Sequence, residues 1–452
     1  MKKKNDIPKL KIIKIKKRLK KMYPSKIIII VLTEIIISSN EYISIPFYHN
    51  KPSEKLFYEN SLLNPLYKKL NIGNPSQEIT LKITFKYCPL SISGKETLIP
   101  NVILYDKSKS KTYKNLGNEI PSKIFSESFN YYLNSSETFD FGNDKFSDIK
   151  FNYVTEINKK ENETGIFGLN LKTMNLGLKE FNLINQLKKE NLISSYSFYF
   201  KYNEENKGEL IIGNYPHEIN NKYSEENSLS TKLEIDSFLN TKIEVKYIKY
   251  GNIDILDNTI NNVIQLSFDF GLIYGNEQFK NVILDNYFQK YLDDNKCIVK
   301  IINDDYESFI CDKNINLKEF QNLNVTLFGN EGNKIYFIFT YEDLFTKIED
   351  KYYFLIYFSK NVPLNIFKFG RQFFKKYIVV FNQDKKIVTF YNNKDFGSYF
   401  KQLSWIILII CIIIIGFLIA YIYQLKRNKR KKQAHELEEE YQEYINKDEK
   451  IK

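Results

Sequence analysis

The middle of the chain is a succession of short segments in which apolar and polar residues alternate, and this pattern restricts the fold more than any other feature. Examples are ITLKITF, SYSFYFKY, KIEVKYIKY and KIYFIFTY, separated by clusters of Gly, Asn, Asp and Ser. Alternation with a period of two gives a strand one core-facing side, and the clusters between are turn formers. The 452 residues are 43 % hydrophobic, enough for a sizeable core. We therefore expect an all-β protein.

Two stretches instead show helical spacing. In LKEFNLINQLKKENLI the apolar residues Leu178, Phe181, Ile184 and Leu187 recur every three positions, which indicates one face of a helix. NEQFKNVILDNYFQKYL is a weaker case later in the chain. Each helix follows strands in a similar order, so we expect two similar halves.

The ends of the chain predict a membrane protein. Residues 403–423 carry no charge and are long enough to cross a bilayer of roughly 30 Å as a helix. The basic cluster from Lys426 to Lys432 then predicts a cytosolic C-terminus by the positive-inside rule. The apolar run 27–37 behind a basic lead resembles a signal peptide, and an uncleaved anchor is the alternative. We expect a single-pass protein whose ectodomain is lumenal or extracellular.

These observations predict five parts of the chain. They are a basic leader and signal peptide (1–39), an N-terminal β-lobe (40–225), a C-terminal β-lobe (226–400), a transmembrane helix (403–423) and a cytosolic tail (424–452).

Cys297 and Cys311 flank two apolar runs around an Asn-Asp-Asp turn. The pattern predicts a hairpin closed by a disulfide, which an oxidising compartment permits. Two reduced, buried thiols are the alternative. Three N-x-S/T sequons, at Asn134, Asn162 and Asn324, are compatible with glycosylation of a lumenal domain.

Other chemistries find little support in the composition. The chain has three histidines, His49, His217 and His435, so we expect no His-based triad, no zinc site and no cofactor. We also expect no other metal, and a calcium site made of acidic oxygens is the alternative left open. The net charge of +12 is concentrated at the two ends, beside the apolar segments. This placement indicates membrane orientation and not nucleic-acid binding.

Several sequence blocks in order resemble the pepsin-like aspartic peptidase family over residues 66–391. YKKLNIGNPSQEITLKI is similar to the family's first strand pair, and ETGIFGLN to its Asp-Gly-Ile-hydrophobic-Gly-Leu segment. FKFGRQFFKKYIVVF is similar to Leu-Gly-Asp-x-Phe-Leu-Arg-x-Tyr-x-x-x-Phe, with Gly370, Phe373, Tyr377 and Phe381 in register. The resemblance implies a bilobal fold with a peptide-binding cleft between two β-lobes.

The family's chemistry needs one aspartate from an Asp-Thr/Ser-Gly loop in each lobe. Two carboxylates that share a proton act as base towards water and as acid towards the peptide carbonyl. Counting from the turn at Pro75 and Gln77, the first aspartate's place falls on Thr84, in the triplet TFK. The first catalytic carboxylate is therefore missing.

The tetrapeptide FDFG occurs twice, with Asp140 and Asp269 at its centre. In the second lobe, counting from Gly275 puts Ser267 at the aspartate's place, whereas an Asp-x-Gly alignment selects Asp269. Comparison of ITFKY with LSFDF favours the first register, which pairs Thr84 with Ser267 and Lys86 with Asp269. In this register we predict an ion pair between Lys86 and Asp269. Asp140 is expected to be a surface strand residue.

The resemblance leaves two functions open. The first is a membrane-tethered pseudoprotease, an aspartic-type endopeptidase by fold that lacks activity and binds an extended peptide or a protein partner as a monomer. The second is a working endopeptidase that uses Asp269 as its catalytic residue with an atypical partner. A structural role without a cleft ligand is a third option.

Overall fold

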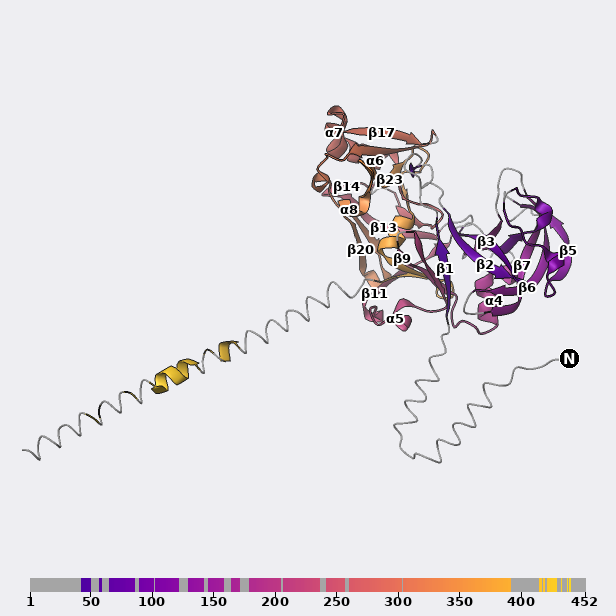
Figure 1. The fold of residues 1–452 in the computed structure, drawn as a ribbon. Coiled ribbons are helices and arrows are strands. Elements are labelled where there is room, and N and C mark those ends of the chain that lie inside the picture. The colour runs from indigo at the N-terminus through magenta and orange to yellow at the C-terminus, as the bar shows by residue number, and fades with distance from the viewer. Residues whose placement is uncertain are drawn as a thin grey trace, which may run out of the picture. The chain divides into compact units, whose positions relative to one another are not determined.

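The structure is a computed structural model (Figure 1) in which the chain forms two compact units, residues 1–219 with 228–391 and residues 220–227 with 392–452. It describes residues 42–49, 57–58, 65–85, 89–100, 102–121, 129–141, 145–157, 164–170, 179–204, 206–235, 241–256, 260–302, 304–391, 414–416, 418, 421–428, 432, 437 and 439.

Two thirteen-stranded sheets make up the first unit, which confirms the all-β class. We call the parts built on the first and second sheets the first and second lobe. The first sheet has the strand order β11-β26-β25-β9-β10-β1-β2-β3-β8-β4-β7-β6-β5. Its strands are β1 (Ile43–Tyr48), β2 (Leu66–Ile72), β3 (Gln77–Thr84), β4 (Leu90–Ser93), β5 (Lys114–Pro121), β6 (Phe129–Asp140), β7 (Lys145–Ile157), β8 (Gly165–Gly168), β9 (Ser197–Glu204), β10 (Lys207–Ile212), β11 (Ser228–Lys232), β25 (Ile378–Asn382) and β26 (Ile387–Tyr391).

The second sheet has the order β20-β19-β13-β15-β24-β16-β23-β18-β22-β21, with β12 and β14 on β13 and β17 on β18. Its strands are β12 (Glu234–Ile235), β13 (Thr241–Tyr250), β14 (Ile253–Asp254), β15 (Val263–Leu266), β16 (Ile273–Gly275), β17 (Cys297–Ile302), β18 (Tyr306–Asp312), β19 (Leu323–Phe328), β20 (Lys334–Phe339), β21 (Phe345–Ile348), β22 (Lys351–Phe354), β23 (Ile356–Phe358) and β24 (Ile366–Phe369). Strands β11, β25 and β26 thus come from the C-terminal half of the sequence and belong to the first sheet.

Short helices connect the strands. They are α4 (Leu183–Lys189), α5 (Pro216–Ile219), α6 (Glu277–Ile283), α7 (Gln289–Asp293), α8 (Tyr341–Leu344) and α9 (Arg371–Lys376), and the π-helical turn η6 (Leu284–Phe288) joins α6 to α7. Helix α4 begins after Asn182, whose side chain accepts a hydrogen bond from the Asn185 amide at 3.0 Å. Asn276 caps α6 in the same way. Both helices lie in the stretches with helical spacing, and a capping amide oxygen satisfies one backbone N–H that the helix leaves open.

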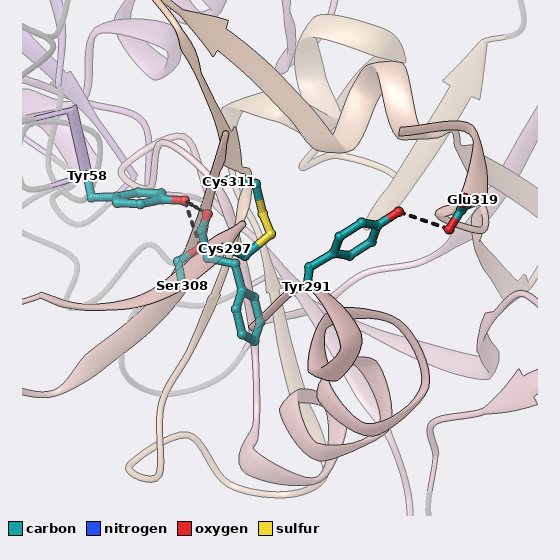
Figure 2. Close-up of a disulfide and its surroundings, with 7 residues drawn as sticks. Tyr58, Tyr291, Cys297, Ser308, Cys311 and Glu319 are labelled. Carbon is teal, nitrogen blue, oxygen red and sulfur yellow. Dashed lines mark hydrogen bonds between the residues drawn. A yellow bond between two sulfur atoms is a disulfide. The ribbon is translucent and has the colours of Figure 1, made fainter. Parts of the chain in front are cut away.

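The predicted disulfide between Cys297 and Cys311 is present (Figure 2). The two cysteines face each other as a pair on the antiparallel strands β17 and β18, with their Cα atoms 4.0 Å apart. Both are buried. The prediction of a closed hairpin is therefore confirmed.

Several other predicted features concern residues outside the described ranges. The predicted leader 1–39 lies there, as do Asn162 and most of the predicted span 403–423. In the part of the chain that the structure describes, we find no helix with the length and apolar character needed to cross a membrane. Asn134 lies in β6 and Asn324 in β19, both half-buried.

Candidate active site

Thr84 and Ser267 occupy equivalent places at the ends of two strands. In the first lobe β3 runs parallel to β8, and Thr84 lies opposite Gly168. In the second lobe β15 runs parallel to β24, with Leu266 opposite Phe369. The Ser267 amide donates to the Phe369 carbonyl at 3.1 Å, which continues that pairing by one residue. Each hydroxyl residue therefore ends a strand beside a parallel neighbour, and each is followed by a phenylalanine.

The two lobes meet through these phenylalanines. The rings of Phe85 and Phe268 stack with centroids 5.2 Å apart and an angle of 7° between their planes. Phe268 also packs on Phe200 of β9 and on Phe374 of α9, with centroids 3.6 Å apart in each pair. Both Phe85 and Phe268 are almost fully buried. This aromatic contact fixes the two strand ends against each other.

Asp269 reaches from the second lobe to the end of β3 in the first. Its Oδ2 accepts a hydrogen bond from the Phe85 amide at 3.1 Å, and the Thr84 hydroxyl donates to the same carboxylate. Ser267 contributes a longer contact, from Oγ to Oδ2 at 3.5 Å, and its Oγ accepts from the Asp269 amide at 3.2 Å. The carboxylate thus holds both hydroxyl residues at the lobe junction.

Burial raises the pKa of the Asp269 carboxyl above its ordinary value, because desolvation penalises the charged form. The Thr84 hydroxyl, the charge of Lys82, the Phe85 amide and Ser267 each act in the opposite direction. These four described groups donate hydrogen bonds or carry positive charge, and none of the four is a carboxylate.

The predicted ion pair with Asp269 cannot be placed, because Lys86 lies outside the described residues. Two other cations act on Asp269 electrostatically: Lys82, on β3, and Arg371, the first residue of α9. Lys82 and Arg371 therefore place positive charge near Asp269, and neither residue was predicted from the sequence.

Arg371 is buried to 3 % exposure, and its Nε and Nη1 have no hydrogen-bond partner among the described residues. Tyr202 interacts with Arg371 electrostatically, and its hydroxyl also has no hydrogen-bond partner among the described residues. Burial lowers the pKa of the guanidinium. The sequence did contain a sign of this buried arginine. In FKFGRQFF, Arg371 stands where the similar Leu-Gly-Asp-x-Phe motif has aspartate.

Gly370 allows this arrangement of the backbone. Its amide donates to the Leu272 carbonyl at 3.0 Å, and the Arg371 amide donates to the Phe270 carbonyl at 2.9 Å. A Cβ atom on Gly370 would lie 2.4 Å from the carbonyl oxygens of both Leu272 and Phe270. A residue without a side chain is therefore required where α9 meets the loop that carries Asp269.

The other FDFG aspartate is placed differently. Asp140 ends β6, opposite Asn71 of β2 and Lys145 of β7. It is partly exposed and acts electrostatically on Lys68. Asp140 is therefore a partly exposed strand residue, as predicted from the sequence.

A comparison with protein families now identifies the chain. The family described as Eukaryotic aspartyl protease matches residues 67–392, well over half of the sequence. The chain belongs to the eukaryotic aspartyl protease family. No curated protein matches it. The resemblance to pepsin-like aspartic peptidases is thereby confirmed.

The part of this aspartyl protease family member that matches starts in β2 and ends directly after β26. It spans both sheets but leaves out β1, Phe57 and Tyr58. Within the described ranges no group of three or more His, Cys, Asp and Glu side chains is placed to hold a metal ion.

Proposed function

We propose that this aspartyl protease family member is catalytically inactive and binds an extended peptide or a protein partner in the cleft between its lobes. One observation carries the proposal. Hydroxyl residues, Thr84 and Ser267, stand at the two equivalent strand ends from which the family's aspartates are expected.

The chemistry of the family explains why this replacement matters. Peptide hydrolysis by this mechanism needs two carboxylates that share one proton, so that one takes a proton from water while the other protonates the carbonyl. Asp269 lies two residues beyond Ser267, and the described groups that interact with it are hydroxyls, an amide and cations. A threonine or serine hydroxyl at its ordinary pKa cannot serve as the missing base.

Peptide binding does not depend on the dyad. A cleft between lobes recognises an extended chain through backbone hydrogen bonds and side-chain pockets. Loss of the carboxylates therefore removes the reaction but leaves recognition as a function that the fold can keep.

A cleavage assay tests the proposal. We expect the purified full-length protein, in detergent and at about pH 4, where the shared-proton dyad of this family works, to leave a mixed peptide library uncut. Asp269→Ala and Asp140→Ala should behave like the wild type. Pepstatin-sensitive cleavage that disappears in Asp269→Ala and persists in Asp140→Ala would overturn the proposal, because the second variant removes the aspartate of the other FDFG copy.

The same assay decides the alternative, an active endopeptidase that uses Asp269 with an atypical partner. The observation that favours it is the raised pKa of Asp269, since a carboxyl that stays protonated at higher pH can act as a general acid.

We also propose that the protein is a single-pass membrane protein with a lumenal or extracellular ectodomain and a cytosolic tail. The uncharged run 403–423 and the basic cluster that follows it support this placement. Protease treatment of sealed vesicles should remove an epitope at the C-terminus and leave residues 40–400 intact. Protection of the tail would reject this orientation.

A further inference from the structure

Phe57 and Tyr58 lie between β1 and β2 in the sequence, yet their side chains are buried in the second lobe. Both neighbouring strands belong to the first sheet. Tyr58 is 1 % exposed and Phe57 8 % exposed. The Phe57 ring packs on Tyr353 at 5.0 Å, and the Tyr58 ring lies 5.4 Å from Tyr357 and 5.5 Å from Tyr353. These two residues therefore occupy a site made by strands far along the chain.

The Tyr58 hydroxyl meets three polar groups at the bottom of this site. It lies 2.7 Å from the Phe309 carbonyl oxygen and 2.8 Å from that of Phe354. Ser308 Oγ donates to it at 3.0 Å (Figure 2). Burial raises the pKa of this phenol, so it stays protonated and acts as a donor to the carbonyls. The Tyr357 hydroxyl in turn donates to the Tyr58 carbonyl.

The site is a separate aromatic cluster beside the main core. Its other buried members all belong to the second lobe: Leu272, Tyr274, Ile302, Tyr353, Leu355 and Tyr357. Within the described sheets neither Phe57 nor Tyr58 pairs with a strand, and the contacts given above reach the second lobe through side chains and the Tyr58 carbonyl. Their departure would therefore break no strand pairing of the described sheets.

The cluster lies next to the candidate active site. Phe270, the residue after Asp269, packs against it, and its members Tyr274 and Tyr357 interact electrostatically with Arg371. Phe57 and Tyr58 fall outside the part of the chain that matches the family. The contact is thus made by residues outside the matched range.

We propose that the second lobe carries a tyrosine-binding pocket that the chain fills with its own Tyr58 and that binds the tyrosine of another peptide when Tyr58 leaves. Selection for tyrosine follows from the contacts. A phenylalanine would fill the same volume but would remove the Tyr58 donor from the Phe309 carbonyl. Ser308 Oγ, in contrast, would still reach the Phe354 and Ile356 carbonyls. We therefore expect the pocket to prefer tyrosine by about tenfold. The inference goes beyond the proposed function and holds whether or not Asp269 supports cleavage.

While Tyr58 fills the pocket, an added peptide cannot bind there. A tethered segment competes at an effective concentration on the order of millimolar. A peptide in solution at micromolar concentration therefore cannot displace Tyr58, and the pocket becomes accessible only when Tyr58 is removed or weakened.

A binding experiment with the full-length protein tests this inference. The probe is a fluorescein-labelled synthetic peptide with the sequence of residues 53–62, SEKLFYENSL, measured by fluorescence anisotropy. We expect Tyr58→Ala protein to bind it at least tenfold more tightly than wild type. The same peptide with phenylalanine at the tyrosine position should bind about tenfold more weakly to this variant, as the loss of a buried hydroxyl's bonds predicts. Tyr48→Ala, which removes a tyrosine of β1 that packs against Tyr67 of the first sheet, is the matched control and should bind like wild type.

Tyr58→Phe provides a second variant that keeps the ring and the packing. It loses only the hydroxyl and should bind the tyrosine peptide with a smaller gain, between wild type and Tyr58→Ala. Thermal denaturation shows which variants are folded. Equal binding by wild type and the folded Tyr58 variants, or equal binding of the tyrosine and phenylalanine peptides, would overturn the inference.

Discussion

Asp269 is subject to two opposing effects within one small site. The Thr84 hydroxyl, the Phe85 amide and nearby cations favour its ionised form, whereas burial favours the protonated form and raises the pKa. The net direction means that the folded protein binds this proton more tightly than the unfolded chain does. Folding is therefore linked to the protonation of one side chain.

This linkage predicts a pH-dependent stability difference between wild type and Asp269→Asn. Below the ordinary pKa of 3.8 both side chains are neutral, and the difference in unfolding free energy should be constant. Between pH 3.8 and the raised pKa, the carboxyl is ionised in the unfolded chain but still protonated in the folded protein. Wild type should therefore lose stability relative to the variant as the pH rises across this range. Urea unfolding from about pH 3 to about pH 7 measures the difference, over the range where a carboxyl with a raised pKa titrates. A gain of wild-type stability with rising pH would contradict the direction of the shift.

At the scale of elements, the hairpin of β17 and β18 connects two features of the second lobe. Its disulfide joins Cys297 to Cys311, and β18 also carries Ser308 and Phe309, which contact Tyr58. Strand β17 pairs only with β18 in the described sheet, so the disulfide is a second link that holds it.

Replacing both Cys297 and Cys311 by serine should lower the unfolding free energy. The cysteines are 14 residues apart, and closing a loop of about this length stabilises a fold by about 3 kcal/mol in the chain-entropy description. Urea unfolding of the double variant measures the loss, and wild type in dithiothreitol should behave in the same way. A loss well below about 1 kcal/mol would fall short of the usual range for such a link.

At the scale of the whole described fold, an aromatic contact and an exchange of strands are two of the links between the lobes. Phe268 of the second lobe packs against Phe85 and Phe200 of the first and against Phe374 of α9. Strands β25 and β26, which follow the second lobe in the sequence, complete the first sheet beside β9. The first lobe is therefore built from two separate parts of the sequence, with the strands of the second sheet, 234–369, between them.

Phe268→Ala should therefore destabilise the protein by about 3–5 kcal/mol, the usual cost of removing a buried phenylalanine. Phe268→Leu keeps most of the apolar volume and should lose less than half as much. Chemical unfolding of the two variants compares them. Equal losses would mean that the phenylalanine ring itself contributes little to the junction.

The local patterns in the sequence were sufficient for some of this structure. Alternation predicted the strands, the Asn-Asp-Asp turn between two cysteines predicted the closed hairpin, and counting from Pro75 led to Thr84. They were not sufficient for Arg371, because one charged replacement inside a well-matched block changes neither period nor spacing. Tyr58 was also missed, since its contacts are more than 200 residues away along the chain and its own segment has no strand or helix period.

The return of β25 and β26 to the first sheet also has a consequence for synthesis. β9 lies between β10 and β25, and among the described strands β11 pairs with β26 alone. While a ribosome adds residues 233–377, the nascent chain already contains β9 but not its second neighbour, so one edge of the sheet stays open. Domains usually fold in order as they emerge, but this first lobe has to wait for strands made after the second lobe. A chaperone that covers exposed strand edges would be needed longest here, during translation of the second lobe.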